Sequence, residues 1–306
     1  MQVKILCLLL TALLCTAGSI MCGGTRAESK LPETKDTTAR TVLAECFTGT
    51  WCPYCPGAEG ALNTLANEMN RTTLAIIEWH IGDGYETPDG SGPNRADFYG
   101  VPGYPTTFFD GLNPTIGGST NPNDNTVYND YKTKINERVG IPANFSISIS
   151  GYINGNYGIV NAEITALNPP PSSTNGTWVH FVICEDKNRS VISGGRTYWL
   201  RFDAVKSLGT DLLNIGTGQT LSLQKNFTIE GTWETDRLWI VVFVQNHDRS
   251  YNGGTYPYYS AEIYQSATLN ISAQPVPEHY GSWLIILVPM SLLIALIPQK
   301  QRKFLS

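Results

Sequence analysis

A pair of cysteines, Cys52 and Cys55, lies between an apolar run and a helix-like pattern, and it constrains the fold more than any other feature of the sequence. The run TVLAECFTG, residues 41–49, is typical of a buried strand. After the cysteines, apolar residues at three- and four-residue steps predict one face of a helix: Ala58, Ala61, Leu62, Leu65 and Met69. A C-x-x-C pair at a helix N-terminus can form one disulfide, and the helix dipole there favours the thiolate of the first cysteine. The pattern therefore predicts thiol–disulfide exchange, with Cys52 as the nucleophile and Cys55 as the resolving thiol.

Two alternatives for this cysteine pair are a zinc half-site and a structural disulfide. The sequence has no second C-x-x-C and no His-x-His, and its histidines are scattered: His80, His180, His247 and His279. No metal site is therefore predicted. A structural disulfide stays open, because an oxidising compartment would favour it.

Both ends of the chain carry apolar segments with basic flanks. Lys4, an apolar run and small residues predict a secretory signal peptide over residues 1–27. The apolar residues 283–298 predict a transmembrane helix, and the basic tail 299–306 places its end in the cytoplasm. Residues 274–282 are interpreted as a stalk. The expected location is the cell surface or another extracytoplasmic site, anchored in the membrane by the C-terminal helix.

The 306 residues include 42% hydrophobic and 15% charged residues, with a formal net charge of −5. This balance suffices for two cores and argues against a nucleic-acid partner. Residues 38–140 alternate strand-like and helix-like segments, which predicts an α/β domain. Residues 142–273 contain strand-like runs separated by Asn, Gly and Pro, which predicts an antiparallel β-sandwich. Asn-x-Ser/Thr sequons give mild support for an exposed, glycosylated surface: Asn70, Asn144, Asn175, Asn188, Asn226 and Asn270.

The segments FTGTWCPYCP and VPGYPTTFFDG together resemble the thioredoxin superfamily over residues 38–140. Trp51 precedes the first cysteine, and Tyr104-Pro105-Thr106 matches the loop in which that superfamily has a cis-proline facing its disulfide. The inner dipeptide Pro53-Tyr54 is the one typical of glutaredoxins. With the predicted sandwich, which would be Ig-like, the whole chain is similar to outer-membrane-protein-28-related bacterial surface proteins.

The resemblance implies roles for the residues that surround the cysteines. Pro105 would lie against the sulfur atoms, Trp51 would border the substrate groove, and Pro53, Tyr54 and Tyr104 would complete the substrate-binding surface. The chain departs from the superfamily at Cys46, which stands where thioredoxins have a buried acid that relays a proton. Glu78, His80 or water would then have to serve as the proton relay.

The sequence thus favours a membrane-anchored, extracytoplasmic thiol-disulfide oxidoreductase that acts on cysteines of exported proteins. It would need no dissociable cofactor, because the cysteine pair carries the electrons, but it would need a redox partner. The alternative is a surface binding or adhesion protein in which the thioredoxin-like domain is a scaffold and the disulfide is structural. Cys46 and Cys184 are expected to be buried core residues rather than redox thiols, although a bond between them is the alternative.

Overall fold

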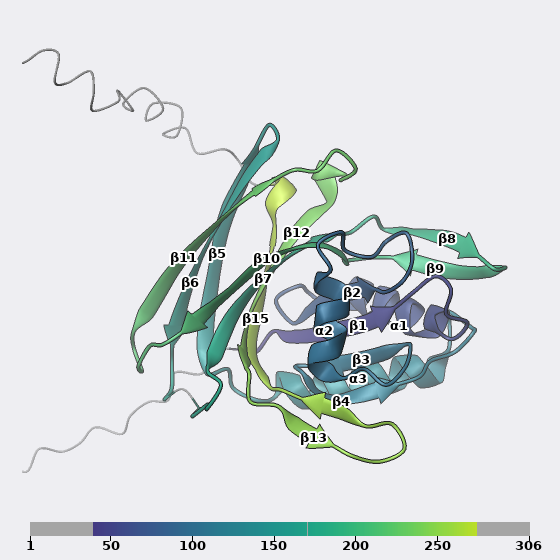
Figure 1. Cartoon of the computed structure of the whole chain (residues 1–306), viewed down its shortest axis with the longest axis horizontal. Coiled ribbons are helices and arrows are strands. Elements are labelled where there is room, and N and C mark those ends of the chain that lie inside the picture. Colours follow the sequence, from purple (N-terminus) through teal and green to yellow (C-terminus); the bar gives the residue numbers. More distant parts are fainter. Residues whose placement is uncertain (1–38, 170, 274–306) are drawn as a thin grey trace, which may run out of the picture. The chain divides into compact units, whose positions relative to one another are not determined.

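The computed structural model describes residues 39–169 and 171–273, so the predicted signal peptide, stalk, transmembrane helix and basic tail lie outside the described residues. The described chain is mostly β-structure, with one eight-stranded and one three-stranded sheet (Figure 1). Its helical elements are α1 (Cys55–Glu68), α2 (Ser91–Tyr99), α3 (Asn125–Val139) and the 3-10 turns η1 (Thr235–Arg237) and η2 (Ile271–Ala273). The expected β-rich chain with few helices is confirmed. Within these residues, no helix has both the length and the apolar character needed to span a membrane.

The first half of the described chain is an α/β unit. Its strands are β1 (Val42–Thr48), β2 (Leu74–His80), β3 (Thr106–Phe109) and β4 (Leu112–Ile116). β1 pairs in parallel with β2 and antiparallel with β3, and β3 pairs antiparallel with β4. The structure adds β4 to the predicted order of elements. The Asp124 side chain caps α3 by accepting hydrogen bonds from the backbone N–H groups of Thr126 and Val127.

The second half is built from antiparallel strands. They are β5 (Phe145–Asn154), β6 (Tyr157–Ala166), β7 (Thr177–Glu185), β8 (Arg189–Ser193), β9 (Arg196–Leu200), β10 (Asp203–Leu213), β11 (Thr220–Thr228), β12 (Leu238–Asn246), β13 (Ser250–Asn252), β14 (Tyr258–Ser260) and β15 (Ile263–Asn270). The three-stranded sheet has the order β11-β6-β5. Its apolar side chains pack with those of β7, β12 and β15 in one core that includes Phe145, Ile164, Phe181 and Ile240. The three-stranded sheet thus packs against one end of the eight-stranded sheet.

One sheet runs through both halves of the described chain. Its order is β15-β12-β7-β10-β2-β1-β3-β4, and β10 joins β2 at the pair Asp203 and Glu78. The Glu78 N–H also donates to the carbonyl of Phe202, at 3.0 Å. The segments predicted as separate domains therefore share backbone hydrogen bonds. The strand that makes this connection, β10, was not predicted from the sequence, and neither was the separate pair β8 and β9.

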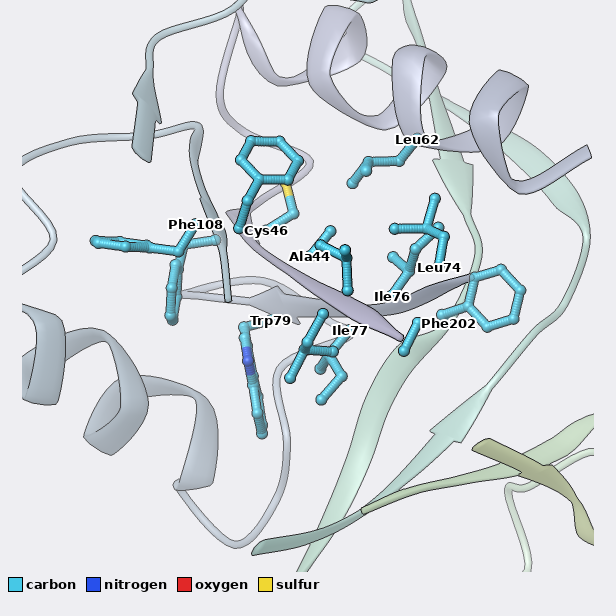
Figure 2. Packing of buried hydrophobic residues seen from close by; sticks show 14 of the residues in the cluster. Ala44, Cys46, Leu62, Leu74, Ile76, Ile77, Trp79, Phe108 and Phe202 are labelled. Atoms are coloured by element: carbon cyan, nitrogen blue, oxygen red, sulfur yellow. The ribbon is translucent and has the colours of Figure 1, made fainter. Parts of the chain in front are cut away.

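Side chains of β1 and β2 fill the layers on both sides of this sheet. Every residue of both strands is buried, as expected for central strands covered on two faces. Figure 2 shows Cys46 on the same side as Leu62 of α1, and Ile77 and Trp79 on the opposite side. Cys46 and Cys184 are fully buried and unbonded, which confirms the prediction of two core cysteines.

We expect two histidines of the second half to make the stability of the fold depend on pH. His180 and His247 approach to 2.9 Å between their Nε2 atoms, and burial, followed by the charge of Arg95, lowers the pKa of both, that of His247 to about 4. The unfolded chain therefore binds more protons than the folded chain below about pH 6.5. We expect the free energy of unfolding to fall as the pH decreases from about 6.5 toward 4.

Urea unfolding between pH 4.5 and 7.5 tests this expectation. Carboxyl groups titrate in the same range, with Asp83 adding to this dependence because its pKa is lowered and Glu59 opposing it because its pKa is raised. The informative quantity is therefore the difference between the wild-type chain and His247→Gln. The substitution should flatten the curve below about pH 6.5. Parallel curves for the two proteins would show that His247 does not titrate on unfolding.

Candidate functional site

The Cys52–Cys55 pair forms a disulfide at the N-terminus of α1. Cys55 is the first residue of the helix, and its Cα lies 5.5 Å from that of Cys52. The Cys52 N–H donates to the carbonyl of Gly49, which closes the turn before the helix. Pro56 suits the first helical turn because it lacks an N–H that the helix would leave unpaired. The unpaired N–H groups and the dipole at this end stabilise a thiolate when the disulfide opens.

Three of the residues predicted to bind substrate are exposed to solvent beside the disulfide. Trp51 and Tyr54 are 53% and 55% exposed, and Pro53 between the cysteines is also exposed. The Trp51 ring meets the edge of Tyr104, with 5.5 Å between ring centroids. The Trp51 indole N–H donates to the carbonyl of Ile81, which fixes the ring. These side chains form an exposed aromatic surface beside the cysteine turn.

Pro105 is buried and follows a cis peptide bond with Tyr104. Gly118 lies between Pro105 and the cysteine turn. A Cβ built on Gly118 would lie 2.8 Å from Pro105 Cγ and 2.4 Å from the carbonyl oxygen of Tyr54. Only a glycine leaves this space open, so the backbone at residue 118 separates Pro105 from the Tyr54 carbonyl.

The disulfide itself is covered by a hairpin that the sequence analysis missed. Strands β8 and β9 pair with each other, and β9 packs against α1. Tyr198 of β9 packs against both cysteines, and its hydroxyl donates to the carbonyl of Cys52 at 3.0 Å. Cys52 and Cys55 are consequently 1% and 0% exposed. A protein disulfide cannot reach the sulfur atoms unless this hairpin moves.

Glu59 connects the same hairpin to the buried face of α1. It lies four residues after Cys55, so both side chains are on one side of the helix. Its carboxylate accepts from Thr48 Oγ1 at 2.5 Å and from the Trp199 N–H at 2.8 Å. Burial raises the pKa of Glu59 to about 7. A carboxyl group with such a pKa can give or take a proton near neutral pH.

The predicted relay residues Glu78 and His80 lie on β2, on the same face of the sheet as Cys46. Glu78 is opposite Cys46, and His80 is opposite Thr48, in the register of β1 and β2. Burial raises the pKa of Glu78 well above its usual range. Burial opposes protonation of His80, but the nearby carboxylates of Asp203 and Asp83 raise its pKa overall.

Asp203 completes this buried group. It is the first residue of β10, and its Oδ1 lies 3.5 Å from His80 Nε2. Sequence reasoning missed Asp203, Tyr198 and Glu59. Glu59 carried a signal, since it is a charged residue among the apolar positions of a helix. Nothing local to Tyr198 or Asp203 indicated that they lie beside residues more than 100 positions earlier.

Comparison with solved structures finds a likeness that covers most of the chain. HBP35 of Porphyromonas gingivalis aligns with a TM-score of 0.55 and 16% identity, over 79% of this chain and 80% of that protein. A domain of the outer membrane lipoprotein Omp28 from Porphyromonas gingivalis aligns with a TM-score of 0.27 and 14% identity, over 42% of this chain and 88% of that one. No protein-family model and no curated protein sequence matches the chain. The first of these likenesses shows that this chain shares its overall fold with HBP35.

Proposed function

We propose that the protein is a cell-surface thiol-disulfide oxidoreductase of the thioredoxin type, with exported proteins as substrates. The observation that carries this proposal is a Cys52–Cys55 disulfide at a helix N-terminus, flanked by exposed Trp51 and Tyr54. The surface location rests on the predicted membrane anchor and on the fold similarity to HBP35. Trp51, Pro53, Tyr54, Tyr104 and Pro105 are the proposed substrate-binding residues.

In the reducing direction, the Cys52 thiolate attacks one sulfur of a substrate disulfide. A mixed disulfide forms between Cys52 and that sulfur, and the other substrate sulfur is released as a thiolate while the substrate stays bound. Cys55 then loses its proton and attacks the Cys52 sulfur, which forms the Cys52–Cys55 bond and releases the second substrate thiolate. The reverse sequence oxidises a substrate dithiol. Glu59, Glu78 or His80 would accept the proton of Cys55.

A second function is favoured by the burial of the disulfide under Tyr198. A disulfide that is 1% exposed at Cys52 suits a structural role, in which the chain is a surface binding protein with a redox-inert clip. The two functions differ in the reduction potential of the pair.

Equilibration of the full chain with graded glutathione buffers distinguishes these functions, with thiol labelling as the readout. Alanine at the other five cysteines, Cys7, Cys15, Cys22, Cys46 and Cys184, leaves only the pair of interest. An exchange-active pair should be half reduced between about −270 and −120 mV, whereas resistance below about −300 mV would indicate the structural role. In a matched assay against a glutathionylated peptide, Cys52→Ser should lose all activity and Cys55→Ser should accumulate the mixed disulfide. Unchanged turnover in Cys52→Ser would contradict the proposed mechanism.

A further inference from the structure

The buried group formed by Glu78, His80 and Asp203 has too few partners for its polar atoms. One ligand-type atom from each residue lies within 4.8 Å of the other two, and the three side chains are at most 2% exposed. Both carboxylate oxygens of Glu78, both of Asp203 and Nε2 of His80 have no hydrogen-bond partner among the described residues. Buried carboxylates are costly unless they are hydrogen-bonded, ion-paired or bound to a metal.

The hydrogen bond on the other side of His80 fixes the direction of its free nitrogen. His80 Nδ1 lies 2.8 Å from Asp83 Oδ2, so Nδ1–H donates to that carboxylate. A metal ion would bind the neutral imidazole, and in that form the Nε2 lone pair points toward Asp203 and Glu78. A carboxylate that accepts from the outer nitrogen of a histidine is the usual support of a metal-binding histidine.

The distances agree with ligands around one small ion. His80 Nε2 and Asp203 Oδ1 are 3.5 Å apart, which is longer than an ordinary N–H···O hydrogen bond of about 2.7–3.2 Å. Two ligands at about 2.0–2.2 Å from a tetrahedral ion are themselves separated by about 3.3–3.6 Å. The backbone supplies this spacing, because Glu78 and His80 are two residues apart on β2 and Asp203 pairs with Glu78 in register.

We propose that Glu78, His80 and Asp203 bind one divalent transition metal ion, with Asp83 supporting His80. One imidazole and two carboxylates suit zinc, manganese or ferrous iron rather than copper(I) or calcium. Two carboxylates balance the charge of the ion. Asp203 also lines a pocket with Glu86, Glu185 and Lys187, so this pocket borders the group of three ligands. The ion would join β2 to β10 and so connect the two halves of the sheet.

This inference does not rest on the proposed exchange activity, because none of the ligands is a sulfur atom. With the metal bound, Glu59 rather than Glu78 or His80 would accept the proton of Cys55. The experiment uses the full chain, purified without a histidine tag, treated with chelator, incubated with Zn²⁺ and then freed of unbound metal. We expect about one zinc per wild-type chain by mass spectrometry of the metal, and strongly reduced zinc in His80→Gln and Asp203→Asn. The control Asp236→Asn, at a side chain that is 81% exposed, should keep the full amount.

Two further variants separate this site from the cysteines and from a folding defect. Cys52→Ser/Cys55→Ser should retain the zinc, and its loss there would assign the metal to the thiols. Asp83→Asn keeps all three ligands and should weaken zinc binding by about 10- to 100-fold. In the wild-type chain, added Zn²⁺ should raise the temperature of unfolding, and chelator should reverse the change.

The inference is overturned if the wild-type chain holds no zinc, or no more than Asp203→Asn. It is also overturned if Zn²⁺ leaves wild-type unfolding unchanged. The cluster would then be a set of groups that share protons, with a charged His80 between Asp83 and Asp203.

Discussion

Replacing Tyr198 by alanine is expected to accelerate reduction of the Cys52–Cys55 disulfide by between about 30-fold and about a thousand-fold. The ring is 1% exposed and covers both cysteines, and the hydroxyl donates to the Cys52 carbonyl. Losing the burial of an aromatic side chain and one hydrogen bond lowers the cost of moving the hairpin by about 2–4 kcal/mol, at tenfold per 1.4 kcal/mol. The measurement is the rate of thiol release with excess tris(carboxyethyl)phosphine, in the chain whose other five cysteines are alanine.

Two matched variants control this prediction. Tyr198→Phe removes only the hydroxyl and should accelerate reduction by about two- to tenfold. Ile192→Ser changes an exposed residue of the same hairpin, 78% accessible, and should leave the rate unchanged. Wild-type rates in Tyr198→Ala would mean that the hairpin does not limit access to the disulfide.

The same variant, assayed with a protein substrate, distinguishes the two candidate functions. If Tyr198→Ala also speeds exchange with a protein substrate, then hairpin movement limits turnover, and a partner that displaces the hairpin would activate the protein. If only the small phosphine reacts faster, the hairpin protects a disulfide that other proteins do not use. The first result favours the oxidoreductase, and the second favours the binding protein.

Replacing Arg95 by methionine is expected to lower the free energy of unfolding by about 3–5 kcal/mol. Arg95 of α2 donates twice to the buried carboxylate of Glu45, at 2.7 Å each, and once to Gln245 of β12 at 2.7 Å. Glu45 is fully buried, and its other donors are the Trp79 indole and the Tyr99 hydroxyl. Without Arg95, the carboxylate would be left as an unpaired buried charge.

Urea unfolding of Arg95→Met and Arg189→Met tests this expectation. Arg189 forms an ion pair with Glu234 of similar length, 2.9 Å, but these side chains are 53% and 36% exposed. Its loss should cost less than about 1 kcal/mol, because water already screens such a pair. The double variant Glu45→Met/Arg95→Met should recover much of the lost stability, since no lone charge remains. If the two single variants lose similar free energies of unfolding, the buried ion pair contributes no more to stability than the exposed one.

Local patterns were sufficient for most elements of this fold. The apolar run before Cys52 predicted β1, and the three- and four-residue steps after Cys55 predicted α1, because side-chain periodicity is a property of the isolated segment. The burial of Cys46 and Cys184 followed in the same way from their position in apolar strands. The position of the cysteine pair at a helix start was also visible in the sequence.

The strands of residues 189–213 were not predicted, although this segment covers the disulfide with Tyr198 and supplies Asp203. The strands β8 and β9 are short and largely polar or half-buried, so their pattern differs little from that of a loop. Their strand conformation depends on contact with α1. Tyr198 reaches the Cys52 carbonyl across 146 residues of sequence, and no local signal encodes that contact.

The sequence by itself determined the secondary structure around the cysteines, the separation of buried from exposed positions and the chemistry available to a C-x-x-C pair. Only the tertiary structure decided that one sheet joins both halves of the described chain, that Tyr198 covers the disulfide and that Asp203 meets Glu78 and His80. Periodicity and helix-end preferences act between near neighbours, whereas the pairing of β10 with β2 depends on the packing of segments far apart in the chain.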